Sequence, residues 1–290
     1  MCKKFAALCR CLLFGLLIAG PAGAVLAATD TTDTTAASAA DLTDVQAIIN
    51  RANYRAYYQG KDGRAQVTMT LRDAQGRERE RKLTILRRDL TDSDAQDDQA
   101  YRSGQLFYIY FSRPADVAKM VFMVQKNLDR EDDRWLYLPA LDLVKRIAAT
   151  DKRTSFAGSD FVYEDVSGRA LEEDRHELIN TTDSYYQLRS TPKTPEAVDF
   201  AYFETFVHKQ TFLPVQAIYY DAKGQPLRTI RTLEVKNIQG FPTVVRAEAL
   251  NQQTGSSTVM SYDSVSYNLG LPADIFTERY LRRAPREYLR

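Results

Sequence analysis

The sequence predicts an α+β fold of mainly β class, built on one large and strongly curved antiparallel sheet. Many segments alternate apolar and polar side chains at period two, which is typical of strands with one buried face. Short turns containing glycine separate several of these segments, and only one long segment near the start shows helical spacing. Ten or more strands with short connections and few helices favour a single antiparallel sheet.

A helix is predicted at about 42–57, before the first strand. Thr43 and Gln46 predict a capping box at its start, and Gly60 and Gly63 are expected to end it. The apolar residues at helical spacing are Val45, Ile48, Ile49 and Ala52.

The first two strands are predicted to form a hairpin. Val67, Met69 and Leu71 share one face of the first strand, residues 74–76 make the turn, and residues 82–87 return as its partner. Further strands are predicted at 105–112, 119–125, 134–138, 143–147, 184–191, 200–208, 214–221, 227–236, 243–251 and 257–267.

Two of these strands are apolar on both faces, at 106–111 and 120–124. This pattern is expected where helices or a ligand cover the second face of a sheet. Tyrosines are also frequent in strands, either because they pack well on pleated surfaces or because they line a concave surface with their phenol oxygens toward water or polar head groups. These tyrosines are Tyr108, Tyr110, Tyr137, Tyr186, Tyr202, Tyr219, Tyr220, Tyr262 and Tyr267.

The start of the chain predicts secretion. Residues 1–27 have three basic residues, an apolar run at 12–18 that is too short to span a bilayer, and small residues ending at Ala27, which is the form of a cleavable signal peptide. Residues 28–40 contain no large apolar side chain and are predicted to be a disordered leader. Residues 41–290 remain as one domain.

The cysteines and charges exclude several classes of function. All three cysteines lie in the signal peptide at Cys2, Cys9 and Cys11, and Arg10 spoils the context that a lipid-attachment cysteine needs. Cleavage would leave 36 of the 39 basic residues against 38 acidic residues, a net charge of −2. Thiolate catalysis and cysteine metal sites are therefore excluded, and no electrostatic attraction to nucleic acid is expected.

An acidic segment at 91–99 interrupts the strand pattern. Asp92 and Asp94 resemble the start of a calcium loop, but the glycine at loop position six is missing and Ser103 occupies the place of the bidentate glutamate. A solvated hairpin loop is the expected structure.

No metal or cofactor site is predicted. His176 and His208 lie in different predicted elements without metal-ligand spacing, so hydrogen-bonded or surface histidines are expected. The sequence also lacks a Gly-x-Ser-x-Gly motif, a phosphate-binding glycine loop and a dinucleotide fingerprint.

Three clustered carboxylates, Asp160, Glu164 and Asp165, could in principle supply the acid and base of a glycoside hydrolase. Basic residues that could pair with them stand immediately upstream. These are Lys145, Arg146, Lys152 and Arg153. A structural ion-pair network is the favoured interpretation, with hydrolysis by Asp160 and Glu164 as the alternative.

The segment from Trp135 to Asp165 resembles the signature block of the LolA-like family, bacterial periplasmic proteins called outer membrane lipoprotein-sorting proteins. Its residues are Trp135, Leu138, Pro139, Arg146, Phe156, Gly158, Ser159, Asp160, Phe161, Tyr163, Glu164 and Asp165. The resemblance is also strong at 113–117, 166–169, 176–178, 190–193, 213–224 and 271–281. Together they extend the resemblance over most of the chain.

The resemblance implies an open half-barrel, as in LolA and LolB, whose concave apolar face is covered by helices. It also implies a non-catalytic periplasmic carrier in the cell envelope that binds acyl chains of a lipid or lipoprotein and moves them between the inner and outer membranes with only transient membrane contact. Members of the family are often found with inner-membrane exporters of the RND (MMPL-like) type. The alternative is therefore an accessory or sensor module that docks on such an RND/MMPL-type exporter without carrying cargo.

Candidate residues for the lining of the lipid-binding cavity follow from the alternation on predicted strands. They are Val67, Met69, Leu71, Phe107, Ile109, Phe122, Trp135 and Tyr137.

Overall fold

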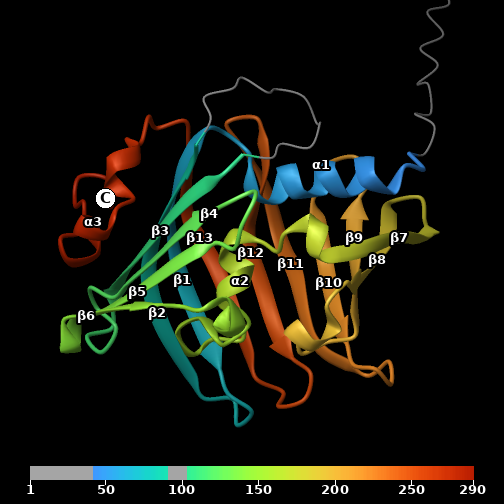
Figure 1. The fold of residues 1–290 in the computed structure, drawn as a ribbon, viewed down its shortest axis with the longest axis horizontal. Helices are drawn as coiled ribbons and strands as arrows, with labels where there is room; N and C mark the ends of the chain where they lie inside the picture. The colour runs from blue at the N-terminus through green and yellow to red at the C-terminus, as the bar shows by residue number, and fades with distance from the viewer. Residues whose placement is uncertain (1–41, 91–102) are drawn as a thin grey trace, which may run out of the picture. The chain divides into compact units, whose positions relative to one another are not determined.

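The computed structural model describes residues 42–90 and 103–290 of the chain (Figure 1). The predicted signal peptide, the predicted leader and the acidic segment at 91–99 lie outside the described residues. The helices are α1 (Val45–Tyr57), α2 (Tyr163–Ser167) and α3 (Glu278–Arg282). Short 3-10 helices lie at Pro139–Leu141, Ala149–Asp151, Phe156–Gly158, Leu171–Glu173, Pro195–Ala197 and Ala273–Ile275.

The strands among the described residues form one sheet of 13, in which neighbouring strands are antiparallel. The strands are β1 (Asp62–Arg72), β2 (Glu78–Asp89), β3 (Gln105–Arg113), β4 (Val121–Lys126), β5 (Asp133–Leu138), β6 (Leu143–Arg146), β7 (Asp174–Thr181), β8 (Tyr185–Pro192), β9 (Tyr202–His208), β10 (Pro214–Tyr220), β11 (Pro226–Ile238), β12 (Phe241–Asn251) and β13 (Ser257–Tyr267). Their order is β6-β5-β4-β3-β2-β1-β13-β12-β11-β10-β9-β8-β7.

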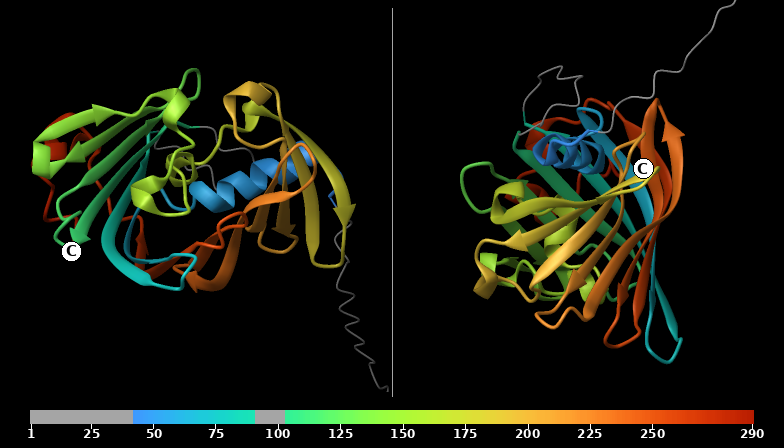
Figure 2. Two further views of the ribbon diagram at one scale, coloured as in Figure 1. Left: turned by 90° about the horizontal axis from the view of Figure 1, so that it is seen from below. Right: turned by 90° about the vertical axis from the view of Figure 1, so that its right-hand side faces the viewer.

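This sheet is curved and open. Figure 2 shows it bent into a trough, with α1 lying across the concave side. The two ends of the strand order, β6 and β7, do not pair with each other in the described part of the chain. The predicted fold, a single curved antiparallel sheet of the half-barrel type with few helices, is therefore confirmed.

The strand predictions agree with the structure except at β7. All the predicted strands are present, with ends shifted by a few residues. Strand β7 was not predicted, because most of its side chains are exposed and it pairs only with β8, so the segment shows little apolar alternation.

The prediction for the first helix is correct in place but wrong in its cap. The N-cap is Asp44 instead of Thr43, and its carboxylate accepts hydrogen bonds from the backbone N–H groups of Gln46 (2.9 Å) and Ala47 (3.4 Å). Gly60 follows the helix with a φ of +70°, as expected for a chain reversal. Gly63 instead lies inside β1.

The two faces of the sheet carry different apolar clusters. One cluster lies on the concave side, and we name it the concave cluster. Its members are Val67, Met69, Leu71, Leu83, Phe107, Ile109, Phe111, Met120, Phe122, Val124, Ile147, Phe156, Phe161, Tyr163, Ala249 and Met260. On the opposite side, the convex cluster joins side chains of β2 to β5 to the C-terminal segment. Its members are Leu86, Leu106, Tyr108, Val121, Met123, Trp135, Leu271, Ile275, Phe276 and Leu281.

The C-terminal segment explains why β3 and β4 are apolar on both faces. It folds back over the convex side, where the Tyr108 hydroxyl donates to the Tyr280 carbonyl at 2.7 Å (Figure 1). The second face of these strands is therefore covered by the end of the same chain, with α3 as its helix.

Candidate functional site

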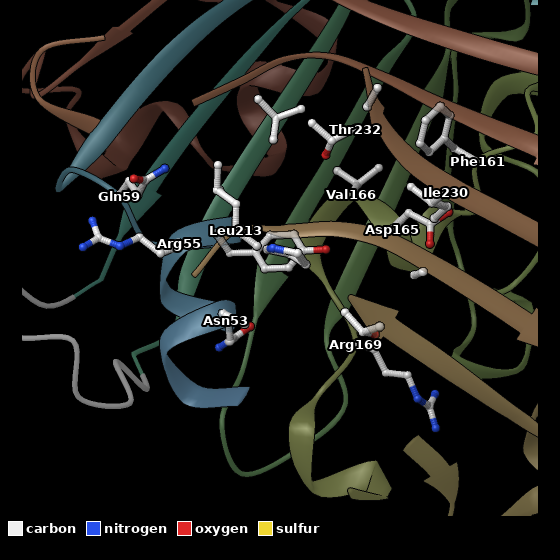
Figure 3. A pocket seen from close by; sticks show the side chains of 18 of the residues that line it. Asn53, Arg55, Gln59, Phe161, Asp165, Val166, Arg169, Leu213, Ile230 and Thr232 are labelled. Atoms are coloured by element: carbon white, nitrogen blue, oxygen red, sulfur yellow. The ribbon is translucent and has the colours of Figure 1, made fainter. Parts of the chain in front are cut away.

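A cavity of about 470 Å³ lies between the concave face, α1 and residues 156–171 (Figure 3). Ile49, Ala52 and Ala56 of α1 face it from one side. Sheet residues from strands on both arms of the trough form the opposite walls. The apolar ones include Ala65, Ile85, Phe107, Ile109, Ala217, Ile230 and Met260. Most of the lining is therefore hydrocarbon, which suits an apolar ligand.

Six of the eight predicted lining residues lie on the concave side, but only two of them reach the cavity. Phe107 and Ile109 line the cavity. Four others do not reach it, because they are packed inside the concave cluster behind it. These are Val67, Met69, Leu71 and Phe122.

Trp135 and Tyr137 require a correction. Both side chains point to the convex face, where Trp135 is a member of the convex cluster and Tyr137 packs against it. The alternation of β5 was read in the wrong phase, because its neighbours in the sheet are apolar on both faces and give no sign of which face is concave. A role in lipid binding for Phe107 and Ile109, the two predicted residues that line the cavity, stays a prediction.

The far wall of the cavity was not predicted from the sequence. Ala217 of β10 and Ile230 of β11 lie on strands distant in sequence from β1 to β3, and only the curvature of the sheet brings them to the same cavity. Alternation within residues 214–221 was a usable signal for Ala217. Ala52 and Ala56 line the cavity because they lie on the face of α1 that is turned toward the sheet.

One wall of the cavity is polar and is organised by Glu164 of α2. Its side chain is 4% exposed and contacts Lys152 at 3.5 Å, Arg153 at 3.1 Å and Arg169 at 3.2 Å. Arg169 also binds Asp174 at 2.8 Å. The ion-pair interpretation is confirmed for Glu164, with two of the four predicted basic residues and an additional arginine.

The other two carboxylates of the signature block have different partners. Asp165 binds Arg228 of β11 at 2.6 Å and accepts the backbone N–H of Val162 at 2.7 Å. Asp160 accepts the hydroxyls of Ser256 (2.6 Å) and Thr258 (2.7 Å) near the start of β13. All three carboxylates thus fasten residues 156–171 to neighbouring elements.

The remaining two predicted basic partners do not join this network. Arg146 pairs with Asp133 on the adjacent strand and lies over the Trp135 ring at 5.4 Å. Lys145 is exposed on β6. The prediction that they pair with Asp160, Glu164 or Asp165 is wrong. Strand β6 is the edge strand at one end of the sheet, several strands away from β13 and β11, which Asp160 and Asp165 contact.

The electrostatics of Glu164 do not suit a general acid. Burial opposes its ionisation, but the surrounding Arg169, Arg153 and Lys152 outweigh burial and hold the pKa of the carboxyl below its ordinary value. The group is therefore ionised at neutral pH, whereas a general acid must hold a proton there.

Three tyrosines line the cavity beside this wall, namely Tyr57 of α1, Tyr219 of β10 and Tyr262 of β13. Burial raises the pKa of all three phenols, of Tyr262 to about 12, and the nearby Asp165 carboxylate raises the pKa of Tyr57 further. The phenols are therefore neutral at physiological pH. Of the predicted strand tyrosines, Tyr219, Tyr262 and Tyr267 line the cavity.

Buried polar contacts fix the C-terminal end of α1 to β2 and β3. The Tyr57 carbonyl accepts from Arg87 Nη1 at 2.6 Å and from Gln105 Nε2 at 2.9 Å. The same two side chains bind the Asp89 carboxylate, at 3.1 Å and 2.7 Å. Arg87 Nη2 also donates to the carbonyls of Gln59, at 2.9 Å, and Gly60. At the other end, the Leu42 N–H donates to the Tyr186 hydroxyl at 3.0 Å.

Asp89 is expected to make stability depend on pH. Burial raises the pKa of Asp89 from 3.8 to about 6, which Arg87 only partly offsets. An acid with a higher pKa in the folded protein makes the folded state bind more protons, so stability is lost as pH rises from about 4 through 6. Relative to Asp89→Asn, the native protein should gain about 1.4 kcal/mol between pH 7.5 and pH 5. Urea unfolding of both proteins at the two pH values measures this difference, and a pH-independent difference would contradict the assignment.

The two histidines are hydrogen-bonded. His176 lines the cavity, with Nδ1 at 2.8 Å from the Ser190 hydroxyl and Nε2 at 2.9 Å from the Leu171 carbonyl, and His208 Nδ1 lies 3.1 Å from the Thr211 hydroxyl. Among the described residues, no group of three or more histidine, cysteine, aspartate or glutamate side chains could hold a metal ion. No helix in residues 42–90 and 103–290 has the length and apolar character needed to cross a membrane.

The fold and the cavity together define an open antiparallel half-barrel with a helix over an apolar hollow, the architecture of LolA-like proteins. A family model described as "Uncharacterized protein" matches residues 103–283, more than half of the chain, so the chain belongs to that family. The predicted kinship with the LolA-like family is confirmed by the solved structures that resemble it. No curated protein matches the sequence.

Three solved structures illustrate this similarity. A putative outer membrane lipoprotein-sorting protein domain from Vibrio parahaemolyticus is 26% identical with a TM-score of 0.70, over 83% of this chain and 100% of that chain. A DUF1329 family protein from Desulfovibrio piger is also 26% identical, with a TM-score of 0.69 over 81% and 97% of the two chains. A LolA superfamily protein from Nitrosomonas europaea shares the fold at 18% identity, with a TM-score of 0.61 over 83% and 100%.

Proposed function

We propose that this protein is a non-catalytic periplasmic carrier that holds acyl chains of a lipid or lipoprotein in the cavity and moves them between the inner and outer membranes. The observation that supports this proposal is the apolar cavity of about 470 Å³ between the concave sheet and α1. Each methylene buried there contributes about 0.8 kcal/mol and needs no directional partner. The similarity to a structure described as a lipoprotein-sorting domain supports the same function.

A carrier must also release its cargo, so the affinity of the cavity must change during the cycle. A change at α1, which forms one wall of the cavity, would require breaking the contacts that join its two ends to the sheet. Native mass spectrometry of protein purified from the periplasm tests whether the cavity is occupied. A bound lipid released under denaturing conditions is the expected result.

Filling part of the cavity should weaken binding without unfolding the sheet. We expect Ala217→Trp to weaken the binding of a pyrene-labelled palmitoyl probe at least about tenfold, because the indole displaces two or more methylenes. Ala222→Trp is the matched control, since Ala222 is exposed in the turn of the same β10–β11 hairpin. Equal affinities for the two variants would contradict the proposed cavity site.

Transfer of the same probe between two populations of vesicles separates carriage from docking. Catalysed transfer supports the carrier. A stable stoichiometric complex with an inner-membrane exporter, without transfer, would instead indicate the accessory or sensor function.

A further inference from the structure

We propose that the cavity holds one hydrocarbon chain at a time, so that its ligand class is the single-chain amphiphile, such as a fatty acid or a monoacyl lipid. This inference rests on the proposed carrier function and narrows its cargo. A protein of this kind differs from a carrier whose cavity encloses two or three chains of one lipid together.

The volume of the cavity sets the limit. A cavity of about 150 Å³ in a protein core holds one benzene molecule, which corresponds to about 25 Å³ for each carbon atom. The cavity of about 470 Å³ therefore has room for about 19 carbon atoms by this scale. One acyl chain of common length fills this space, and a second chain would lie outside it.

The contacts at the C-terminal end of α1 oppose widening of the cavity. At the C-terminal end, Arg87 and Gln105 hold the Tyr57 carbonyl, and the Gln59 side chain donates to the Pro242 carbonyl at 2.9 Å on the opposite arm of the sheet. Arg87, Gln59 and Gln105 are largely buried, so separating α1 from the sheet leaves desolvated polar groups without partners.

Residues 156–171, which form the second wall outside the sheet, are also held by polar contacts. Asp160 is bound to the start of β13, Asp165 to β11, and Glu164 to three cations. Both covering elements are thus held to the sheet by polar contacts, the C-terminal end of α1 to β2, β3 and β12 and residues 156–171 to β11 and β13. The volume between them is set by these contacts and not by the size of a bound ligand.

A chain-length series tests the proposal on the full-length mature protein. Saturated fatty acids from 10 to 24 carbons are titrated against the pyrene-labelled probe. Affinity should rise about fourfold for each added methylene and stop rising near 18 carbons, where the cavity is full. In Ala217→Trp the plateau should move to shorter chains. An affinity that continues to rise through 24 carbons would overturn the single-chain limit.

A comparison of chain number gives an independent measurement. Palmitoyl lysophosphatidylglycerol, dipalmitoyl phosphatidylglycerol and a tripalmitoyl cysteinyl peptide compete against the same probe. The two- and three-chain ligands should compete less than about tenfold better than the one-chain ligand, because their additional chains stay outside the cavity. A gain of tenfold or more would overturn this inference and leave the carrier function standing. Failure of every ligand in both series to bind would instead contradict the carrier function itself.

Discussion

Replacing Gly168 by alanine is expected to lower the free energy of unfolding by about 4 kcal/mol. Gly168 follows α2 with φ +77° and ψ 150°, a conformation that is essentially restricted to glycine. A Cβ atom there would lie 2.6 Å from Cε2 and 2.7 Å from Cζ of the Tyr57 ring. Backbone strain and the steric clash therefore add, and the clash falls between α1 and residues 156–171, the two elements that cover the cavity.

Urea unfolding of Gly168→Ala at neutral pH measures this cost. Gly255→Ala is the control, because Gly255 also has a positive φ of +74° but nothing lies within 4 Å of the position that its Cβ atom would take. The control should lose only about 1–2 kcal/mol, the cost of the left-handed backbone. Similar losses in the two variants would contradict the clash.

A double-mutant cycle with Tyr57→Ala locates the clash. Removing the ring in the Gly168→Ala background should cost at least about 1 kcal/mol less than removing it from the native protein, because the two residues are in contact. Additive effects would show that the backbone alone is responsible.

The sequence was sufficient to predict the fold because strand alternation is a local signal. Most predicted strands, the hairpin turn at 74–76 and the position of α1 all depend on neighbouring residues. The edge strand β7 was missed because it has few buried side chains. Strands β3 and β4 show the limit of alternation, since burial on both faces hides which face is concave. The misplacement of Trp135 and Tyr137 follows directly from that ambiguity.

The candidate site was predictable only where its residues are close in sequence. The pairing of Glu164 with Lys152 and Arg153 was predictable because both basic residues lie within 12 positions of Glu164 in the sequence. The partnership of Asp165 with Arg228 bridges 63 positions and depends on how β11 crosses the trough. Local sequence patterns do not show which residues so far apart in the chain come into contact, because that depends on how the sheet curves.

Replacing Glu164 by glutamine is expected to destabilise the protein by about 4 kcal/mol at neutral pH, because it leaves three cations without their central anion in a buried site. Asp199→Asn is the matched control. Asp199 binds the same Arg153 at 2.7 Å, but its side chain is 68% exposed, so its loss should cost less than about 1 kcal/mol. Equal costs for the two variants would contradict a central role for Glu164.

The pH dependence of this cost provides a second test. The pKa of Glu164 is held below its ordinary value of 4.5, so the folded protein favours the ionised carboxylate. This contribution to stability is fully present above pH 4.5 and is lost as pH falls through the lower pKa of the folded protein. The difference between the native protein and Glu164→Gln should therefore stay constant from pH 7.5 to pH 5 and shrink only below pH 4.5. Asp89 acts in the opposite sense within the window from pH 4 to 6, so urea titrations of the two variants over the same pH range separate the two carboxylates. A cost of Glu164→Gln that already shrinks at pH 6 would place the pKa of Glu164 above its ordinary value and contradict the ion-pair network.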